Sequence, residues 1–288
     1  MQRMQITTLS VMAGSTACNL SCPYCISKTT YRVGQAICTP VDLGRIAFLA
    51  DKFLRVCSGL PFGIITGKGE PTLADPDEIG ALIEVLYAGG HGLIPELQTN
   101  GVRLDADRLA SWREKGLNTL ALSCVSERDE VNSQILSGGR VSWKLGELVE
   151  RASGMGLLVR LTVILTRGGV DDEARFLSFM RWAKSRGAQQ VTFRRMGAPR
   201  DLAREGSQRV ADWIDQNRIE PSFLIDALEA GGREQDPLPW AQVFTYDGLS
   251  VVVTDHMNPP RDNMLRHAII QPDGHLYGSW DDPGNILI

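Results

Sequence analysis

The chain has 288 residues, a formal net charge of −4, and 43% hydrophobic and 22% charged residues. This composition is ordinary for a folded globular protein, and the acidic balance argues against a surface built to bind nucleic acid. No apolar run reaches the ~18 residues of a membrane span, and no secretory pattern opens the sequence, so we expect a cytoplasmic protein with no membrane partner.

Strand-like and helix-like patterns alternate along the first two thirds of the sequence. Apolar runs predict strands at residues 6–13, 62–66, 93–98, 119–123, 157–165 and 190–195. Amphipathic stretches predict helices at residues 41–57, 77–87, 105–115, 141–153 and 171–185. Six β–α units in succession predict an α/β fold, a partial (β/α)6 TIM-like barrel with a parallel sheet and right-handed crossovers. A complete eight-unit barrel would need more units than the pattern contains.

The pattern changes after about residue 205. One more helix is predicted at residues 201–219, and Pro, Gly and Asp then become frequent. Pro272-Asp-Gly274 lies between two apolar stretches, which predicts a β-hairpin. We therefore divide the chain into a barrel core, residues 1–215, and a small C-terminal extension, residues 216–288.

Three of the six cysteines, Cys18, Cys22 and Cys25, lie within eight residues directly after the first predicted strand. Thiolates suit zinc or iron–sulfur clusters. A four-iron cluster ordinarily takes four cysteines, so three would leave one iron open to a small chelating molecule. Two alternatives remain: a structural zinc site completed by Cys38, and a dithiol redox pair formed by Cys22 and Cys25.

The spacing Cys-x3-Cys-x2-Cys, with Tyr24 before the last cysteine, resembles the signature of the radical S-adenosylmethionine (SAM) superfamily. Thr-Gly-Lys-Gly-Glu-Pro-Thr-Leu at residues 66–73 is similar to its Gly-Gly-Glu-Pro motif, although Lys68 interrupts the glycine pair. The resemblance implies a [4Fe-4S] cluster on the three cysteines and SAM bound at the open iron. Reductive cleavage of SAM, with an electron from an external donor such as flavodoxin or ferredoxin, would give a radical that takes a hydrogen atom from the substrate.

The resemblance also assigns binding residues at the ends of the predicted strands. Thr99-Asn100-Gly101 resembles the Thr-Asn-Gly of a subgroup that contains the molybdenum-cofactor cyclase and peptide-modifying enzymes, and Tyr24 would lie against the SAM adenine. The implied SAM contacts are Tyr24, Gly67, Gly69, Glu70, Ser123, Arg160 and Met196. The implied substrate contacts are Thr99, Asn100, Arg195, Tyr277 and Trp280. Arg160 also fits a solvated side chain, and Met196 also fits the core.

Arg194 and Arg195 end the sixth predicted strand. Because side chains alternate along a strand, one of the two should point inward, where a guanidinium suits a carboxylate or phosphate of the substrate. We assign this role to Arg195.

The end of the chain resembles the SPASM or "twitch" extension of radical SAM enzymes, with Pro-Asp-Gly at the hairpin and Gly-Asn-Ile at residues 284–286. His267 and Trp280 stand near the places of that extension's cysteines, and no cysteine follows Cys124. We therefore expect one cluster only, with the hairpin covering the barrel mouth. Further candidates for the pocket are Trp240, His256 and His275.

These patterns favour a radical SAM enzyme that acts on a small polar metabolite by epimerisation, rearrangement, dehydrogenation or cyclisation. Without an auxiliary cluster to accept an electron, redox-neutral outcomes are favoured. An epimerase needs a hydrogen donor, and Cys124 at the end of the fourth strand is a candidate, although a buried thiol is also ordinary core. The alternatives are modification of a ribosomal peptide, which would need a partner, and a zinc-stabilised binding module without enzymatic activity.

Overall fold

The structure is a computed structural model, and it describes residues 4–13, 16–28, 42–58, 62–88, 93–197, 207–238, 240–254, 264–280, 282 and 284–288. Cys38 and His256 lie outside the described residues, so their predicted roles stay predictions.

The described chain forms twelve strands and eight α-helices. The strands are β1 (Met4–Met12), β2 (Cys57–Ser58), β3 (Phe62–Thr66), β4 (Ile94–Thr99), β5 (Thr119–Cys124), β6 (Leu158–Ile164), β7 (Gln190–Arg194), β8 (Arg233–Glu234), β9 (Ala241–Tyr246), β10 (Leu249–Thr254), β11 (Met264–Ile270) and β12 (Leu276–Tyr277). The α-helices are α1 (Leu43–Val56), α2 (Pro76–Ala88), α3 (Ala106–Glu114), α4 (Asp129–Ser137), α5 (Leu145–Gly154), α6 (Glu173–Ser185), α7 (Ser207–Asn217) and α8 (Ser222–Gly231). No described helix is both long and apolar enough to cross a bilayer.

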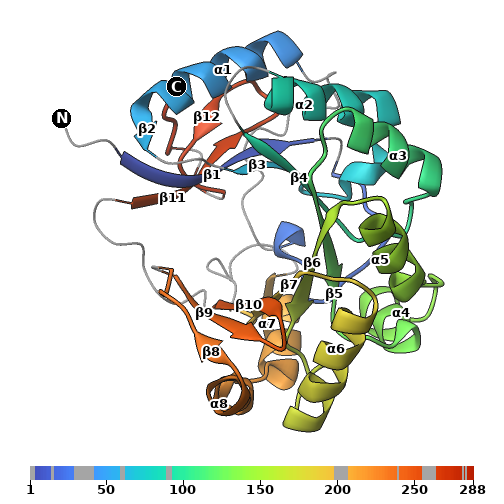
Figure 1. The fold of residues 1–288 in the computed structure, drawn as a ribbon. Helices are drawn as coiled ribbons and strands as arrows, with labels where there is room; N and C mark the ends of the chain where they lie inside the picture. Colours follow the sequence, from blue (N-terminus) through green and yellow to red (C-terminus); the bar gives the residue numbers. More distant parts are fainter. Residues whose placement is uncertain are drawn as a thin grey trace.

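All strands belong to one sheet in the order β12-β11-β1-β3-β4-β5-β6-β7-β10-β9-β8, with β2 paired to β1. The six predicted strands correspond to β1, β3, β4, β5, β6 and β7, and each pairs in parallel with the next. Helices α1 to α6 cover the outer side of this curved sheet (Figure 1). The predicted partial barrel is therefore confirmed.

The C-terminal extension continues the sheet at both of its edges. β10 pairs in parallel with β7, and β11 pairs in parallel with β1. The predicted hairpin at Pro272-Asp-Gly274 joins β11 to the antiparallel β12. A second hairpin, which we did not predict, joins β9 to β10 through Asp247 and Gly248, both with positive φ. One sheet thus contains strands from both sides of residue 215, and the division of the chain there stays a prediction.

Helix α4 was also missed: the helix predicted at residues 141–153 corresponds to α5, and no helix was predicted at residues 129–137. The side chain of Asn132 in α4 accepts hydrogen bonds from the backbone N–H groups of Val125 and Ser126, at 2.9 and 3.2 Å. Gly138 ends the helix in the left-handed conformation. These contacts fix α4 beside the end of β5.

The register of the strands shows which face of the sheet packs against the helices and forms the core. Phe193 of β7 lies against Phe176 and Phe179 of α6, with ring centroids 5.6 and 6.0 Å apart. Phe193 is in register with Val163 of β6, which is in register with Cys124 of β5. This row faces the helices. The alternate row, Ser123, Thr162 and Thr192, faces the barrel interior, which is the polar face of the sheet.

Candidate functional site

The three-cysteine loop leaves β1 at its carboxyl end. Cys18 is exposed, and Cys22 and Cys25 are partly buried. The backbone N–H of Ser21 donates to the carbonyl of Leu136 at the end of α4, at 3.0 Å. The structure thus holds three thiols in one loop at the edge where the parallel strands end, as the sequence predicts.

Burial raises the pKa of two of these thiols, Cys18 and Cys22. Burial, followed by the negative charges of the Cys25 and Cys18 thiolates, raises the pKa of Cys22 to about 12. Burial also raises the pKa of Cys18. Metal binding must therefore displace protons from the loop, because thiolates, not thiols, ligate metals.

The number and type of donors in this loop suit an iron–sulfur cluster, because three thiolates leave one iron open. Structural zinc needs four ligands around a single point. In an iron–sulfur cluster each cysteine binds a different iron, so the sulfurs surround a larger body. The donor set of Cys18, Cys22 and Cys25 therefore suits a [4Fe-4S] cluster.

The turn after β3 packs directly against the cysteine loop. A Cβ on Gly69 would lie 2.0 Å from the carbonyl oxygen of Ala17, and a Cβ on Gly67 would lie 3.0 Å from that of Ala13. The backbone N–H of Glu70 donates to the same Ala17 carbonyl at 2.9 Å. The two glycines therefore allow the backbone of the cysteine loop to approach this turn.

The buried Glu70 carboxylate ties the same turn to the end of β4. Its Oε1 accepts from the Thr72 backbone N–H at 3.0 Å and from the Thr72 and Thr99 hydroxyls, and its Oε2 accepts from the Asn100 backbone N–H at 2.8 Å. The Asn100 side chain donates to Asn19 of the cysteine loop at 2.7 Å. Thr99 and Asn100 are buried and join β4 to the turn after β3 and to the cysteine loop, and their contact with the substrate stays a prediction.

Tyr24 and Met196, far apart in sequence, meet on one wall of the interior. Buried Met196 packs in a small cluster with Val210 and Ile214 of α7, and Tyr24 packs against this cluster. Tyr24 also lies against Trp213 of α7, with ring centroids 5.7 Å apart. Burial raises the pKa of Tyr24 well above its usual value. Tyr24 and Met196 are thus placed together, and their contact with adenine stays a prediction. The contribution of Trp213 was missed, since nothing in its local sequence distinguishes it from core.

Arg160 crosses the interior to a buried carboxylate. It pairs with Glu96 of β4, whose side chain is 1% exposed, and Glu96 also accepts a hydrogen bond from Gln98 at 3.0 Å. Ala121 of β5 is in register with both Gln98 and Arg160, and its small side chain leaves room for this pair. Arg160 faces inward as predicted, and its guanidinium binds an acidic side chain. Exposed Ser123 faces the same interior.

Removing one partner of this pair should be costly. Arg160→Met leaves the Glu96 carboxylate buried without its counter-charge, so we expect a loss of about 3–5 kcal/mol in the free energy of unfolding. The double variant Glu96→Gln/Arg160→Met should recover most of this loss, because no charge is then buried. Urea unfolding of the two variants measures the difference, and equal stabilities would contradict this account.

Arg195 does not take the inward position. It forms a bidentate ion pair with Glu220, with N–O distances of 2.7 and 2.8 Å. Arg194 is in register with Ile164, which packs against the cluster containing Met196, so Arg194 is the inward arginine. We assigned the inward position to Arg195, whereas Arg194 occupies it.

Cys124 faces away from the interior, so its assignment as a hydrogen donor is wrong. It lies in the row of Val163 and Phe193 and is 1% exposed in the core beneath the helices. Burial raises the pKa of this thiol, as expected for core packing.

Cys124→Ala should consequently leave SAM cleavage and substrate turnover within about twofold of wild type. The only cost should be about 1–2 kcal/mol of stability from the lost packing. Parallel measurement of 5′-deoxyadenosine formation and urea unfolding tests this. Loss of turnover with unchanged SAM cleavage would restore Cys124 as a hydrogen donor.

The C-terminal segment reaches the site through Trp280. The Nζ of Lys68, the residue that interrupts the glycine motif, donates to the Trp280 carbonyl at 3.0 Å. The Trp280 ring contacts His267, with centroids 6.1 Å apart, and His267 is hydrogen-bonded to Thr8 at 2.6 Å. His267 and Trp280 thus lie together, and the contact of Trp280 with the substrate stays a prediction.

The remaining hairpin candidates bond within the hairpin. The hydroxyl of buried Tyr277 donates to Asp273 at 2.7 Å, and its contact with the substrate stays a prediction. His275 lies 3.5 Å from the same carboxylate.

Comparison with known proteins agrees with this arrangement. The model of the radical SAM superfamily matches residues 12–198. GTP 3′,8-cyclase of Listeria monocytogenes is 28% identical over 176 residues, which are 59% of this chain and 48% of that protein. Mycofactocin maturase MftC of Mycolicibacterium smegmatis is 26% identical over 161 residues, which are 56% of this chain and 38% of that protein. The match to the cyclase thus spans about half of that protein's length.

Solved structures share the fold. Streptococcus suis SuiB bound to S-adenosylmethionine superimposes with a TM-score of 0.63 at 10% identity, covering 96% of this chain and 61% of that one. The family model covers more than half of the chain and includes the cysteine loop, the turn after β3 and strands β3 to β7. The chain therefore belongs to the radical SAM superfamily, and it is an enzyme that uses a [4Fe-4S] cluster and SAM.

Proposed function

We propose that this enzyme uses SAM cleavage to take a hydrogen atom from a small polar metabolite held inside the barrel. The observation that carries the proposal is the contrast between the two faces of the sheet. The outer face is apolar, whereas the inner face holds the Glu96–Arg160 pair, Gln98 and Arg194. Such a lining suits a ligand with several polar groups rather than an apolar one.

The chain's own residues divide the work of binding. Cys18, Cys22 and Cys25 hold the cluster at the carboxyl edge of the sheet. Tyr24 and Met196 give the SAM adenine an apolar wall, and Ser123 and the turn at Gly67, Gly69 and Glu70 bind the rest of SAM. When bound, the cluster supplies the electron that cleaves SAM, and this electron comes from an external carrier such as flavodoxin or ferredoxin. Trp213 packs against the Tyr24 ring on this side.

A redox-neutral reaction, epimerisation or rearrangement, is favoured. No cysteine follows Cys124 in the sequence, so the segment around His267 and Trp280 offers no thiolates for a second cluster. This segment therefore holds no second cluster that could accept an electron from a substrate radical.

Anaerobic reconstitution followed by counting of iron and sulfide tests the core of the proposal. We expect about four irons per chain and formation of 5′-deoxyadenosine from SAM and dithionite. Incubation with a deuterated small-molecule extract should then transfer deuterium into 5′-deoxyadenosine. Zinc in place of iron, or a cluster that never cleaves SAM, would contradict the proposal.

Modification of a peptide is the second candidate. It is favoured by similarity to a maturase and to SuiB, which has also been solved bound to its precursor peptide SuiA, with a TM-score of 0.57 and 15% identity over 96% of this chain and 60% of that one. Ultrafiltration of a cell extract separates the two candidates. Stimulation of 5′-deoxyadenosine formation by the filtrate supports a metabolite, and stimulation by the retained peptides supports a peptide.

A further inference from the structure

Gln271 directly follows β11, and its side chain carries a buried amide that no neighbour satisfies. The residue is 2% exposed. Its backbone is fixed by the hairpin turn, because its N–H donates to the His275 carbonyl and its carbonyl accepts from Gly274, both at 3.0 Å. Neither Oε1 nor Nε2 has a hydrogen-bond partner among the described residues. Buried polar groups without partners are uncommon in folded proteins because each one costs free energy.

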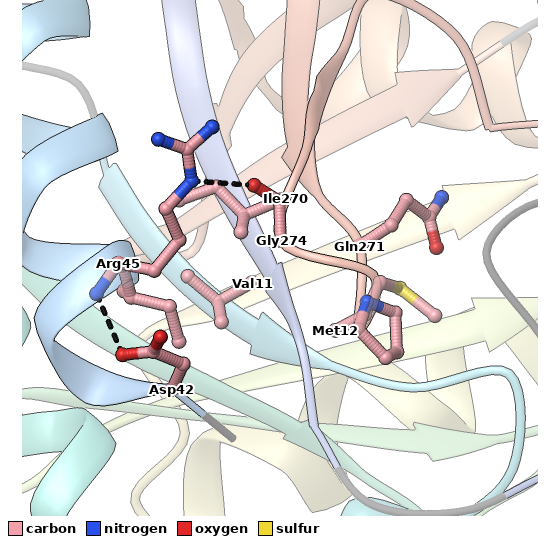
Figure 2. Close-up of a pocket in the computed structure, with 9 residues that line it drawn as sticks. Val11, Met12, Asp42, Arg45, Ile270, Gln271 and Gly274 are labelled. Atoms are coloured by element: carbon pink, nitrogen blue, oxygen red, sulfur yellow. Dashed lines mark hydrogen bonds between the residues drawn. The ribbon is translucent and has the colours of Figure 1, made fainter. Parts of the chain in front are cut away.

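The amide is aimed into the barrel. Ile270 is in register with Val11, so Gln271 stands beside Met12 at the carboxyl end of β1. Figure 2 shows the side chains of Gln271 and Met12 on the opposite side of β1 from those of Val11, Ile270 and Arg45, which lie toward α1. Gln271 therefore faces the interior at the edge from which the cysteine loop leaves.

A second unsatisfied group lies on the same face. Ser10 is 1% exposed, its Oγ has no partner among the described residues, and it precedes Met12 by two positions on β1. Ser10 is in register with Ile269 of β11 and Ile64 of β3. We call this surface the β1–β11 wall, which consists of Ser10, Met12, Ile64, Ile269 and Gln271. Two unsatisfied polar groups thus lie on one otherwise apolar stretch of the inner face.

The chemistry of the β1–β11 wall selects its ligand. A glutamine amide offers an acceptor and a donor side by side, so it pairs best with a planar group that offers a donor and an acceptor in return. Neither Ser10 nor Gln271 carries a charge, so a carboxylate or phosphate would find no counter-charge in these two residues. We expect the SAM adenine at Tyr24 and Met196, which lie in one cluster with Ile164 of β6. Because β3, β4 and β5 separate β6 from β1 in the curved sheet, this cluster lies across the interior from the β1–β11 wall.

We propose that Gln271, assisted by Ser10, determines specificity by binding an amide or lactam edge of the substrate. This inference rests on the proposed function only in placing the substrate inside the barrel.

Thermal unfolding of the reconstituted holoenzyme with SAM gives the first test. Gln271→Met removes the two unsatisfied polar atoms at nearly constant volume, so we expect Tm to rise by roughly 2 °C or more. The matched control is Gln98→Met, which should lower Tm because the Gln98 amide donates to Glu96 at 3.0 Å. A fall in Tm for Gln271→Met would show that the amide is structural, satisfied for instance by buried water, and would overturn the proposal.

Binding of fragments gives the second test. Saturation-transfer NMR on the holoenzyme would compare 2-pyrrolidinone, which has a lactam edge, with cyclopentanone, which has the same ring without the N–H. We expect 2-pyrrolidinone to bind wild type about tenfold more tightly than Gln271→Met, and cyclopentanone to bind both equally. Equal binding of 2-pyrrolidinone to both proteins would overturn the proposal.

SAM cleavage with dithionite alone distinguishes a failure of the Gln271 proposal from a failure of the proposed function. We expect it to be the same in wild type and Gln271→Met. A loss confined to the variant would show that the amide binds SAM and would overturn the proposal. Absence of cleavage in wild type would instead count against the proposed function.

Discussion

Replacing Cys22 with alanine is expected to abolish both iron loading and SAM cleavage. Cys22 is the central thiol of the loop, and its removal leaves only Cys18 and Cys25 as ligands. Loss of a residue that only hydrogen-bonds to a metal ligand already lowers metal affinity or activity about 10–100-fold. Loss of a ligand itself should therefore lower 5′-deoxyadenosine formation by more than roughly 100-fold. Iron and sulfide content and the visible absorbance of the cluster are the direct measurements.

The control for this variant is Cys124→Ala, which removes a buried thiol from the opposite face of the sheet and should load iron normally. Circular dichroism should show both variants folded. Full iron content in Cys22→Ala would show that another residue completes the cluster and would contradict the assignment of the three ligands.

Alanine at Gly69 should have the second-largest effect, although Gly69 contacts no metal. The added Cβ would lie 2.0 Å from the Ala17 carbonyl oxygen, a backbone atom that cannot move without moving the cysteine loop. Overpacking of this kind costs about 1–3 kcal/mol or more. Iron affinity should therefore fall roughly ten- to a hundredfold.

Gly154→Ala is the matched control, because nothing lies within 4 Å of a Cβ at that position of α5. It should load iron as wild type does and gain about 0.5–1 kcal/mol of stability. A chelator competition on the reconstituted proteins gives the affinities. Unchanged iron affinity in Gly69→Ala would mean that the cysteine loop is free to shift.

The parts of this molecule that local pattern determines could be predicted. The six strands β1 and β3 to β7 follow from apolar runs, and the cysteine loop and the turn after β3 follow from residue type and spacing. The places of β10 and β11 could not be predicted, because each pairs with a strand remote in sequence. The partners of Arg160 and Glu70 were missed for the same reason.

One error could have been avoided from the sequence itself. Ser123 and Cys124 are adjacent in one strand and must point to opposite faces, so an inward Ser123 already implies an outward Cys124. Thr99 and Asn100 were assigned to the substrate by resemblance, and their side chains also bind Glu70 and Asn19, which the sequence did not reveal. Small polar residues at a strand end hydrogen-bond to the residues that form a site as readily as to its ligand.

The pairing of β1 with β11 bears on how the chain reaches this fold. Thr8 and His267, which are hydrogen-bonded, are separated by 259 positions in the sequence. Contacts of such separation close large loops and slow folding. Until β11 arrives, β1 presents an unpaired edge beside its apolar neighbours, and such edges template association between chains. The strand that leads into the cysteine loop is therefore completed late, so the period of greatest exposure to aggregation precedes the assembly of the site.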